Sequence, residues 1–255
     1  MMHITAYYSS VDPAAAYTAL AAVQDPAINT QGNNVRVSSS IPFLFGSAGL
    51  TAAAVYTGSQ VRSPSLRTLN NLYVRPLVNA VVFGDPPEVM LFPRNPRSMV
   101  AAEDVQFWTD STPAGGAEAH YGLVWYCDGV IDPVQGEIFT VGASSASTLT
   151  AGSWVNSNIT FDQQLPSGSF QICGLRAEGA NLIAARVVFP GGGGNEAFRP
   201  GVAACTSSAV VDPQYARFGQ LGVFGTFNQD NPPTIDALGV TDTTQRLTLD
   251  LIKVA

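Results

Sequence analysis

The sequence predicts an all-β protein built from antiparallel sandwiches or barrels, with one short N-terminal helix. Turn-forming residues recur about every 8 to 16 residues along a chain of 255 residues, and the segments between them are rich in aromatic and β-branched residues. The helical patterns of about 10 to 15 residues that separate the strands of α/β proteins are missing. Roughly 13 to 16 short strands fit between the turns, as expected for sandwiches or barrels.

The N-terminal region is expected to hold a strand followed by the helix. Met2–Tyr8 has the composition of a strand. Asp12 can cap the N-terminus of a helix, and Pro13 suits its first position because no backbone N–H is needed there. Pro26 disfavours helical backbone at the residue before it, so the helix is expected to end there and to span Asp12–Gln24.

The rest of the first half is predicted to consist of short strands separated by rigid turns. An apolar run from Ile41 to Val55 is interrupted by Pro42, Gly46 and Gly49, which favours turns within it. The strand-like segments of this half are Val35–Ser38, Ala52–Thr57, Leu72–Leu77, Ala80–Phe83, Val105–Trp108 and Tyr121–Tyr126.

A cluster of turn signals near the midpoint predicts a boundary between two halves. Cys127–Gly136 contains an Asp-Gly pair, an Asp-Pro pair and a further Gly. We therefore expect an N-terminal strand and helix over residues 1–30, a first β-barrel over residues 31–128, a linker over residues 129–136 and a second β-barrel over residues 137–255. One large sandwich with long loops would give the same number of strands and remains an alternative.

The second half has the more regular strand patterns. Leu182–Phe189 is almost wholly apolar, as a strand buried on both faces would be. Leu247, Leu249 and Leu251 alternate with polar residues, which is typical of a strand with one buried face. Further strands are predicted at Glu137–Val141, Trp154–Phe161, Phe170–Arg176 and Arg217–Phe227.

The composition excludes several classes of protein. Charged residues make up 12% of the chain, the net charge is −7, and Lys253 is the only lysine beside eleven arginines. A hydrophobic share of 46% is too high for a disordered chain. Binding to nucleic acid through phosphates needs clustered Lys and Arg, and the acidic balance argues against it.

The cysteines and the apolar segments predict folding in a reducing cytoplasm. Cys127, Cys173 and Cys205 form an odd, widely spaced set, so we expect three buried thiols rather than disulfides or a zinc site. No apolar run reaches the ~18 residues that span a bilayer, and no pattern of a signal peptide opens the sequence.

The search for catalytic motifs identifies no active site. His3 is expected to be exposed near the terminus, while His120 and Glu118 share one face of a strand and are expected to be solvated. The chain lacks HxH, HExxH, CxxC and G-x-S-x-G patterns, and Gly191–Gly194 lacks the Gly-Lys-Ser/Thr ending of a phosphate loop. We predict no catalytic residue, no cofactor and no metal ligand, and therefore a protein that is not an enzyme.

Carboxylates and tryptophans leave three weaker alternatives open. Asp128 with Asp132, or Asp230 with Asp236, could hold a loop calcium ion, although Asp more often forms turns. A pair of carboxylates could serve a glycosidase or lyase. A carbohydrate- or receptor-binding β-sandwich, such as a spike or fibre head, would use exposed members of the set Trp108, Trp125 and Trp154, whose strand settings favour the core.

The surface composition favours packing between molecules over catalysis. Arg is enriched and Lys depleted at protein interfaces, and this chain has the same bias. Its 13 Phe, 8 Tyr and 3 Trp residues fit the same interpretation.

The whole chain resembles the compact double jelly-roll major capsid proteins of small lipid-containing bacteriophages. The resemblance lies in the size, the two β halves joined near residues 127–136, the short N-terminal helix and the Ala/Gly/Thr/Pro-rich loops. It implies two jelly-roll barrels in tandem that stand upright in a shell, and three chains that form a pseudo-hexagonal homotrimer. In that family the trimers tile an icosahedral virion around an internal membrane, and no catalytic residues are involved.

The resemblance also implies the partners and the location of the protein. These partners are other copies of the chain, other capsid proteins such as a vertex protein, and the internal membrane, within a virion assembled in the host cytoplasm. Residues 1–35 contain neither Lys nor Arg, so the basic arm with which many capsid proteins neutralise the genome is missing. Direct contact with nucleic acid is therefore not expected.

Overall fold

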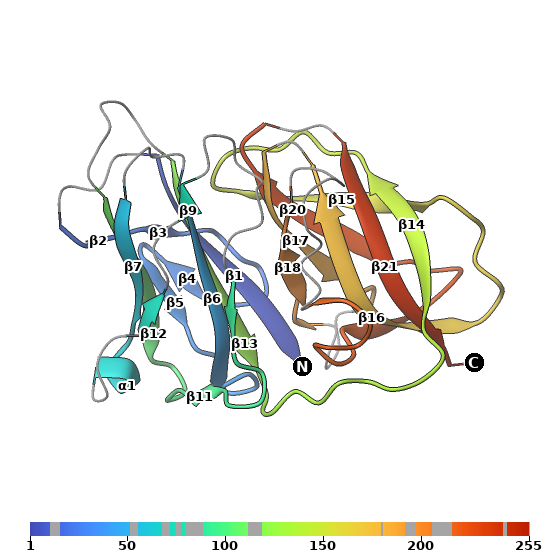
Figure 1. Cartoon of the computed structure of the whole chain (residues 1–255), viewed down its shortest axis with the longest axis horizontal. Coiled ribbons are helices and arrows are strands. Elements are labelled where there is room, and N and C mark those ends of the chain that lie inside the picture. The colour runs from blue at the N-terminus through green and yellow to red at the C-terminus, as the bar shows by residue number, and fades with distance from the viewer. Residues whose placement is uncertain are drawn as a thin grey trace. The chain divides into compact units, whose positions relative to one another are not determined.

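The chain is all-β, and nearly all of its strand pairs are antiparallel (Figure 1). The computed structural model describes residues 1–10, 16–51, 56–67, 72–74, 78–79, 89–111, 119–179, 181–191, 197–205, 216–241 and 244–254. Within these ranges the only α-helix is the single turn α1 (Pro64–Arg67), and no helix is long and apolar enough to cross a membrane. The chain divides into an N-terminal unit, Ile4–Val130, and a C-terminal unit, Met1–His3 with Ile131–Ala255.

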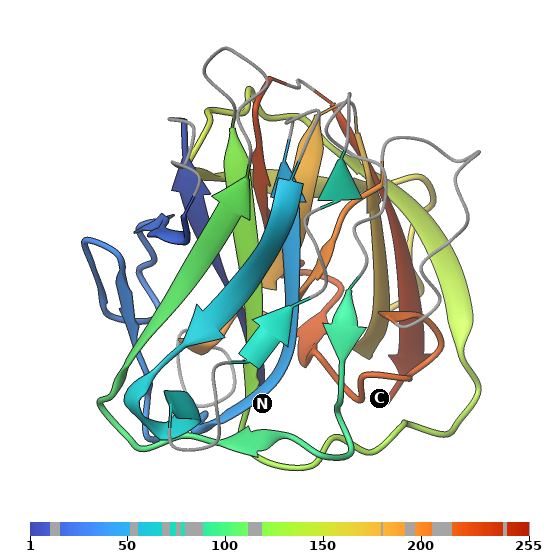
Figure 2. The same cartoon turned by 60° about the vertical axis from the view of Figure 1, so that its left-hand side comes forward.

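The N-terminal unit consists of two sheets. One has the order β10-β6-β13-β1-β3, with β9 and β11 also paired to β6, and the other has the order β4-β5-β12-β7-β8, with β2 paired to β12. Figure 2 shows the long strands β7 and β12 side by side. The strands are β1 (Met2–Ser9), β2 (Thr18–Ala19), β3 (Ala21–Ala22), β4 (Thr30–Gln31), β5 (Asn34–Arg36), β6 (Phe43–Thr51), β7 (Tyr56–Arg62), β8 (Leu72–Val74), β9 (Val78–Asn79), β10 (Met90–Leu91), β11 (Arg97–Ser98), β12 (Asp104–Ser111) and β13 (His120–Cys127).

The C-terminal unit is one curled sheet with the order β18-β17-β20-β15-β14-β21-β16-β19. Beyond β18, the Cys205 backbone bonds Ala177 and Gly179 at 3.0 and 3.1 Å, which joins the edge strand β18 to β16, the strand next to the opposite edge. The strands are β14 (Phe139–Ser145), β15 (Trp154–Phe161), β16 (Ser169–Glu178), β17 (Leu182–Val188), β18 (Gly201–Ala203), β19 (Gly225–Asn228), β20 (Thr234–Gly239) and β21 (Gln245–Lys253).

Both units pair their strands in the same nested order. In the C-terminal unit the first strand pairs with the last, β14 with β21, and the pairs β15–β20, β16–β19 and β17–β18 follow inward. In the N-terminal unit the corresponding pairs are β1–β13, β5–β12, β6 with β10 and β11, and β7–β8. Each unit therefore folds as a long hairpin whose two arms pair along their whole length.

Each unit has its own apolar core between facing strands. In the N-terminal unit, the fully buried ring of Phe107 on β12 fills the space that Gly122 on β13 leaves by having no side chain. Tyr7 lies beside the same ring, with centroids 5.9 Å apart. In the C-terminal unit, Phe189 lies over Gly225 in the same manner. These close approaches fix the distance between the strands that carry the core.

The predicted N-terminal helix is wrong over its described part. Residues 18–22 form the short strands β2 and β3, while Asp12 and Pro13 lie outside the described residues. The backbone N–H groups of Leu20 and Val23 bond the carbonyls of Phe107 and Ala6 at 2.9 Å, and Leu20 is buried. Pairing with strands on both sides replaces the i to i−4 bonds of a helix, so tertiary context overrides the local preference.

Most of the predicted strands that lie within the described residues are confirmed. β17 is buried on both faces, and Leu247, Leu249 and Leu251 are buried on β21. The break predicted inside Ile41–Val55 is wrong, because β6 continues through its glycines, and most of Arg217–Phe227 forms turns before β19 begins. The predicted strand Ala80–Phe83 and parts of Ala52–Thr57 and Leu72–Leu77 lie outside the described residues.

We expect Gly122→Ala to destabilise the protein by about 1–3 kcal/mol, because a methyl group there would collide with the Phe107 ring inside a packed core. Gly129→Ala is the control, since nothing lies within 4 Å of the added Cβ atom. Urea unfolding of the two variants measures the difference. Equal stability of the two variants would show that Phe107 can move aside.

Candidate interaction surface

The segment between β18 and β19 presents an aromatic side chain to solvent. Phe218 is 54% exposed, and Val223 on the same loop is 37% exposed. The backbone of Phe218 has φ of 51°, a left-handed conformation that bulky residues rarely adopt. Gly219 and Gly222 follow with φ of 73° and 71°, so the loop turns tightly around Phe218. This unfavourable backbone conformation must be stabilised by contacts of the loop with the rest of the unit.

The anchor is the carboxylate of Asp250, which lies beneath the loop. Arg217 donates to Asp250 through Nε at 2.7 Å and Nη2 at 2.9 Å, and the N–H of Phe218 donates to Oδ2 at 2.8 Å. Thr140 Oγ1 donates to Oδ1 at 2.7 Å. Asp250 therefore connects the loop to strands β14 and β21.

The surroundings of Asp250 favour its charged form. Burial alone would raise the pKa of this carboxyl group, but hydrogen bonds from Arg217, Phe218 and Thr140 and the charge of Arg217 outweigh it. The pKa is consequently lowered from its ordinary value of 3.8. Asp250 is 0% exposed, and a side chain at Gly174 would collide with its carboxylate. The cluster is thus a fully satisfied buried ion pair.

A second segment contacts the loop through its backbone. The N–H of Val134 bonds the carbonyl of Gly219 at 2.9 Å, and the carbonyl of Asp132 lies next to Gly222. Asp132 and Glu137 on this segment are both exposed. The guanidinium of Arg217 lies 4.9 Å from the centroid of the Phe218 ring, so this ring takes part in a cation–π contact.

The N-terminal unit has a groove between β10 and β11. Its volume is about 510 Å³, and it is lined by Met90, Phe92, Asn95, Pro96 and Arg97. The groove is shaped by a turn in which the N–H of Asn95 bonds the carbonyl of Phe92 at 3.0 Å. We call it the Met90 groove. Its loop carries two exposed arginines, Arg94 and Arg97, and no carboxylate between residues 90 and 97.

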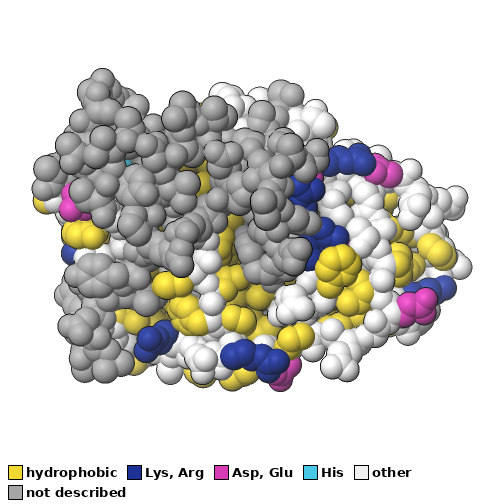
Figure 3. Space-filling view, in the orientation of Figure 1, with side chains coloured by type: hydrophobic (Ala, Val, Ile, Leu, Met, Phe, Trp, Pro, Cys, Tyr) yellow, Lys and Arg dark blue, Asp and Glu magenta, His cyan; other side chains and the backbone are white. Residues whose placement is uncertain are grey.

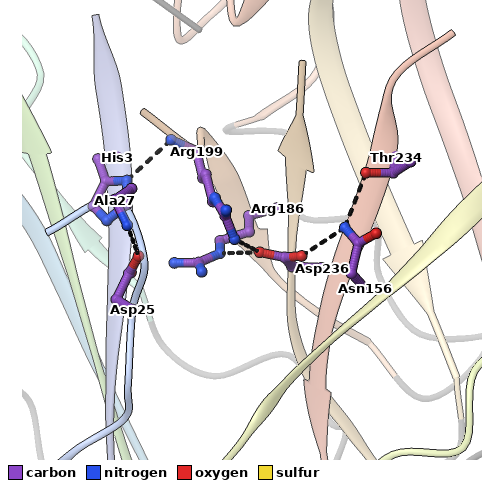
Figure 4. A network of polar contacts seen from close by, with 8 residues as sticks. All are labelled: His3, Asp25, Ala27, Asn156, Arg186, Arg199, Thr234 and Asp236. Atoms are coloured by element: carbon purple, nitrogen blue, oxygen red, sulfur yellow. Dashed lines mark hydrogen bonds and ion pairs between the residues drawn. The ribbon is translucent and has the colours of Figure 1, made fainter. Parts of the chain in front are cut away.

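A second buried ion-pair network lies on the strands β15, β17 and β20 (Figure 4). Arg186 Nε donates to Asp236 Oδ2 at 3.0 Å, and Arg199 donates to the same oxygen. Asn156 Nδ2 donates to Oδ1 at 2.8 Å. His3 accepts the backbone N–H of Arg199 at Nδ1, at 3.0 Å. Both oxygens of Asp236 are used, so the network fixes strands rather than offering a free acid or base.

The tryptophans that a sugar site would use are either buried or already in contact with an arginine side chain. Trp125 is fully buried. The guanidinium of Arg62 lies 4.1 Å from the ring centroid of Trp108, and that of Arg186 lies 4.0 Å from Trp154. Both rings are half-buried and already take part in cation–π contacts, which leaves less of each for a sugar to stack on.

The histidines lie in different surroundings from those expected. His3 and His120 are both 0% exposed, so the predicted exposure of His3 and solvation of His120 are wrong. Burial follows from their strands: His3 is on β1 beside Phe198, and His120 opens the fully buried strand β13. Glu118 lies outside the described residues, so its expected place beside His120 stays a prediction.

The cysteines and the acidic pairs fall into structural roles. All three cysteines are free and buried, as predicted, and burial raises the pKa of Cys127 and of Cys173 to about 11. Asp236 is buried in its ion pairs while Asp230 is exposed, so these two do not form a common calcium site. The described part of the chain contains no cluster of three or more His, Cys, Asp or Glu side chains suited to a metal ion.

Sequence reasoning did not identify the residues that shape this surface. Asp250 occupies an outward position in the alternating strand 247–251, where a solvated carboxylate is expected. Its partner Arg217 lies 33 residues away, and no local pattern connects the two. The exposed Phe218 sits in a segment that was predicted to be a strand.

Comparisons with known proteins establish no family. No family model and no curated protein matches the chain. Among solved structures, a chain in the atomic structure of Sulfolobus Turreted Icosahedral Virus matches 87% of this chain with 14% sequence identity and a TM-score of 0.21. This chain covers 56% of that longer chain. A TM-score this low supports no inference about function.

Asp250→Asn should lower the free energy of unfolding by about 3–5 kcal/mol, because it leaves the buried Arg217 without its counter-charge. The matched control is Asp162→Asn, which removes an exposed pair with Arg246 and should change stability by less than about 1 kcal/mol. Urea unfolding at neutral pH compares the two. Similar losses in both variants would refute the special role of the buried pair.

Acid should remove the contribution of Asp250. Its folded pKa lies below the unfolded value of 3.8, so its stabilisation is complete above that value and is lost as the pH falls through the lowered pKa. The difference in unfolding free energy between the wild type and Asp250→Asn should be constant from about pH 5 to 8 and narrow below about pH 4. A difference that varies between pH 5 and 8 would contradict this assignment.

Proposed function

We propose that this chain is a structural virion protein: a major capsid protein of the double jelly-roll type that self-assembles as trimers into an icosahedral shell. The observation that carries the proposal is the nested strand pairing of both units. An antiparallel hairpin of eight strands that wraps into two sheets, with the first strand beside the last, is a jelly roll, a fold used in viral capsids.

The pairing supports a jelly roll in each unit. The C-terminal unit places β14, β21, β16 and β19 in one half of its sheet and β15, β20, β17 and β18 in the other. The N-terminal unit repeats this order with β1, β13, β6 and β10 in one sheet and β5, β12, β7 and β8 in the other. We propose that the two units are tandem jelly-roll domains, with the junction at residues 129–136.

The surface composition supports assembly between copies. Charged residues make up only 12% of the chain, so few strongly hydrated side chains would lose water when two copies come into contact. Arginine, which is enriched at interfaces, supplies almost all of the positive charge. Among the described residues on the face shown in Figure 3, charged side chains lie among hydrophobic and uncharged ones. Large hydrophobic side chains that are exposed among the described residues are Val100, Val130, Phe218, Val223 and Val254.

The buried charges support a structural role over an enzymatic one. Asp236 and Asp250 are bound to arginines, and Glu103 accepts hydrogen bonds from Ser65 and from the N–H of Val100. These groups stabilise strands and loops. The partners in this proposal are other copies of the chain, a vertex protein and an internal membrane, within a virion assembled in the host cytoplasm. The net charge of −7 argues against direct binding of nucleic acid.

The purified chain is expected to form trimers that associate further into closed shells. Light scattering coupled to size-exclusion chromatography measures the oligomer, and negative-stain electron microscopy shows the shells. A monomer that persists at high protein concentration under every tested salt and calcium condition would overturn the proposal. Binding to glycans on an array, with a shift in tryptophan fluorescence, would instead favour the carbohydrate-binding alternative.

A further inference from the structure

We propose that the Met90 groove binds an anionic phospholipid of a bilayer, with the phosphate on Arg97 and the adjoining hydrocarbon on the apolar lining. The inference rests on the proposed function, because it assigns a lipid class and a contact surface to the membrane partner named there. The site that it adds lies within residues 90–100 of the N-terminal unit.

The groove is formed by a segment that is attached at both ends. The N–H of Phe92 bonds the carbonyl of Phe45 at 2.8 Å, and the N–H of Met99 bonds the carbonyl of Pro42 at 2.8 Å. The segment between these bonds also contains two prolines, which restrict its backbone. A groove that is already shaped before the ligand arrives loses little entropy on binding.

Arg97 supplies a positive charge that no described residue neutralises. Its residue lines the groove and is exposed, and its side chain makes no ion pair or hydrogen bond with the described part of the chain. Other described arginines do bind carboxylates, namely Arg36, Arg176, Arg186, Arg199, Arg217 and Arg246. The guanidinium of Arg97 therefore has donors to offer to a phosphate, whose oxygens it can bind in pairs.

The segment around Arg97 is free of negative charge although the chain as a whole is acidic. Residues 90–102 contain neither Asp nor Glu, while the net charge of the chain is −7. The next carboxylate, Glu103, is buried and accepts the N–H groups of Val100 at 3.1 Å and of Ser65 at 2.9 Å. An anionic surface is repelled by the chain in general and is accepted best at this segment.

The same segment presents apolar side chains to solvent. Met90, Phe92 and Pro96 line the groove, whose volume of about 510 Å³ is typical of ligand sites. Val100 is 65% exposed, the highest value among the large hydrophobic side chains of the described residues. Apolar side chains beside a basic one suit the interface of a bilayer, where the apolar groups enter the hydrocarbon boundary and the guanidinium stays at the phosphates.

A bilayer lipid uses both parts of this site, whereas a free anion would use only one. Inorganic phosphate would bind Arg97 and leave the apolar lining and Val100 in water. A lipid buries the apolar side chains and pairs the guanidinium at the same time. One arginine gives weak binding for a single copy, and a shell that presents many copies to one bilayer adds their contributions.

Arg97→Gln tests the phosphate contact. The wild-type chain is expected to float with vesicles that contain phosphatidylglycerol and to bind vesicles of phosphatidylcholine alone more weakly. Arg97→Gln should weaken binding to the phosphatidylglycerol vesicles by about fivefold, and added salt should weaken the wild type. Arg246→Gln is the matched control, because it changes the net charge equally at an exposed ion pair elsewhere, and its effect should stay below about twofold.

Val100→Ser tests the apolar contact. The variant should bind the phosphatidylglycerol vesicles at least about threefold more weakly, whereas Val254→Ser, at a valine that is 46% exposed elsewhere, should bind like the wild type. Circular dichroism and urea unfolding establish that the variants are folded.

A fluorescent label locates the contact. Asn95→Cys carrying a polarity-sensitive dye should shift to shorter wavelength on the phosphatidylglycerol vesicles, because Asn95 lines the groove. Asn158→Cys with the same dye, at an exposed position on β15, should not shift. The native thiols are buried, so the dye reports on the introduced cysteine.

The outcomes separate this inference from the proposed function. A wild-type chain that forms trimers and shells but binds both kinds of vesicle equally would overturn the inference and leave the capsid proposal standing. Vesicle binding by a chain that never associates with itself would overturn the capsid proposal and keep the lipid site.

Three further results would overturn the inference. Equal losses in Arg97→Gln and Arg246→Gln would show a general effect of charge. Impaired association between copies in Arg97→Gln, with vesicle binding unchanged, would assign the groove to a protein partner. Displacement from vesicles by inorganic phosphate, with no effect of Val100→Ser, would assign it to a free anion.

Discussion

The need to pair backbone polar groups without helices is the constraint on which this structure depends. Outside the single turn of α1, the described backbone must find its hydrogen bonds between strands or in turns. Nested pairing meets this need by matching strands that lie far apart in sequence, such as β1 with β13 and β14 with β21. It also explains residues 18–23, whose N–H groups bond neighbouring strands instead of forming a helix.

Buried ion pairs then hold those parts of the C-terminal unit that strand pairing alone does not fix. Asp250 and Asp236 both lie on strands of the C-terminal unit, and each binds arginine from another part of the chain. Removing one partner of such a pair is costly, because the remaining charge stays buried. Asp250 uses this strength to hold a loop, whereas Asp236 ties together β15, β17 and β20. In a chain with few charges, the same ion pairs therefore decide the conformation of a surface.

The interaction surface and the fold are linked through Asp250. The strained conformation of Phe218 persists because its N–H and the neighbouring guanidinium are bound from below. Strain of this kind survives where surrounding contacts over-determine it. A buried residue of the C-terminal unit thus fixes the conformation of an exposed loop.

The sequence by itself determined the all-β class, the regular strands of the second half and the three buried thiols. These features have local causes: β-branched and aromatic segments, alternation over 247–251 and the apolar run of β17. Only the tertiary structure decided that residues 18–22 form short strands, that β6 continues through its glycines and that both histidines are buried. It also brought Arg217 to Asp250 and so exposed Phe218. The physical reason is the distance along the chain over which each effect acts. Propensity and periodicity act over a few residues, whereas strand pairing and charge neutralisation join residues far apart in the chain.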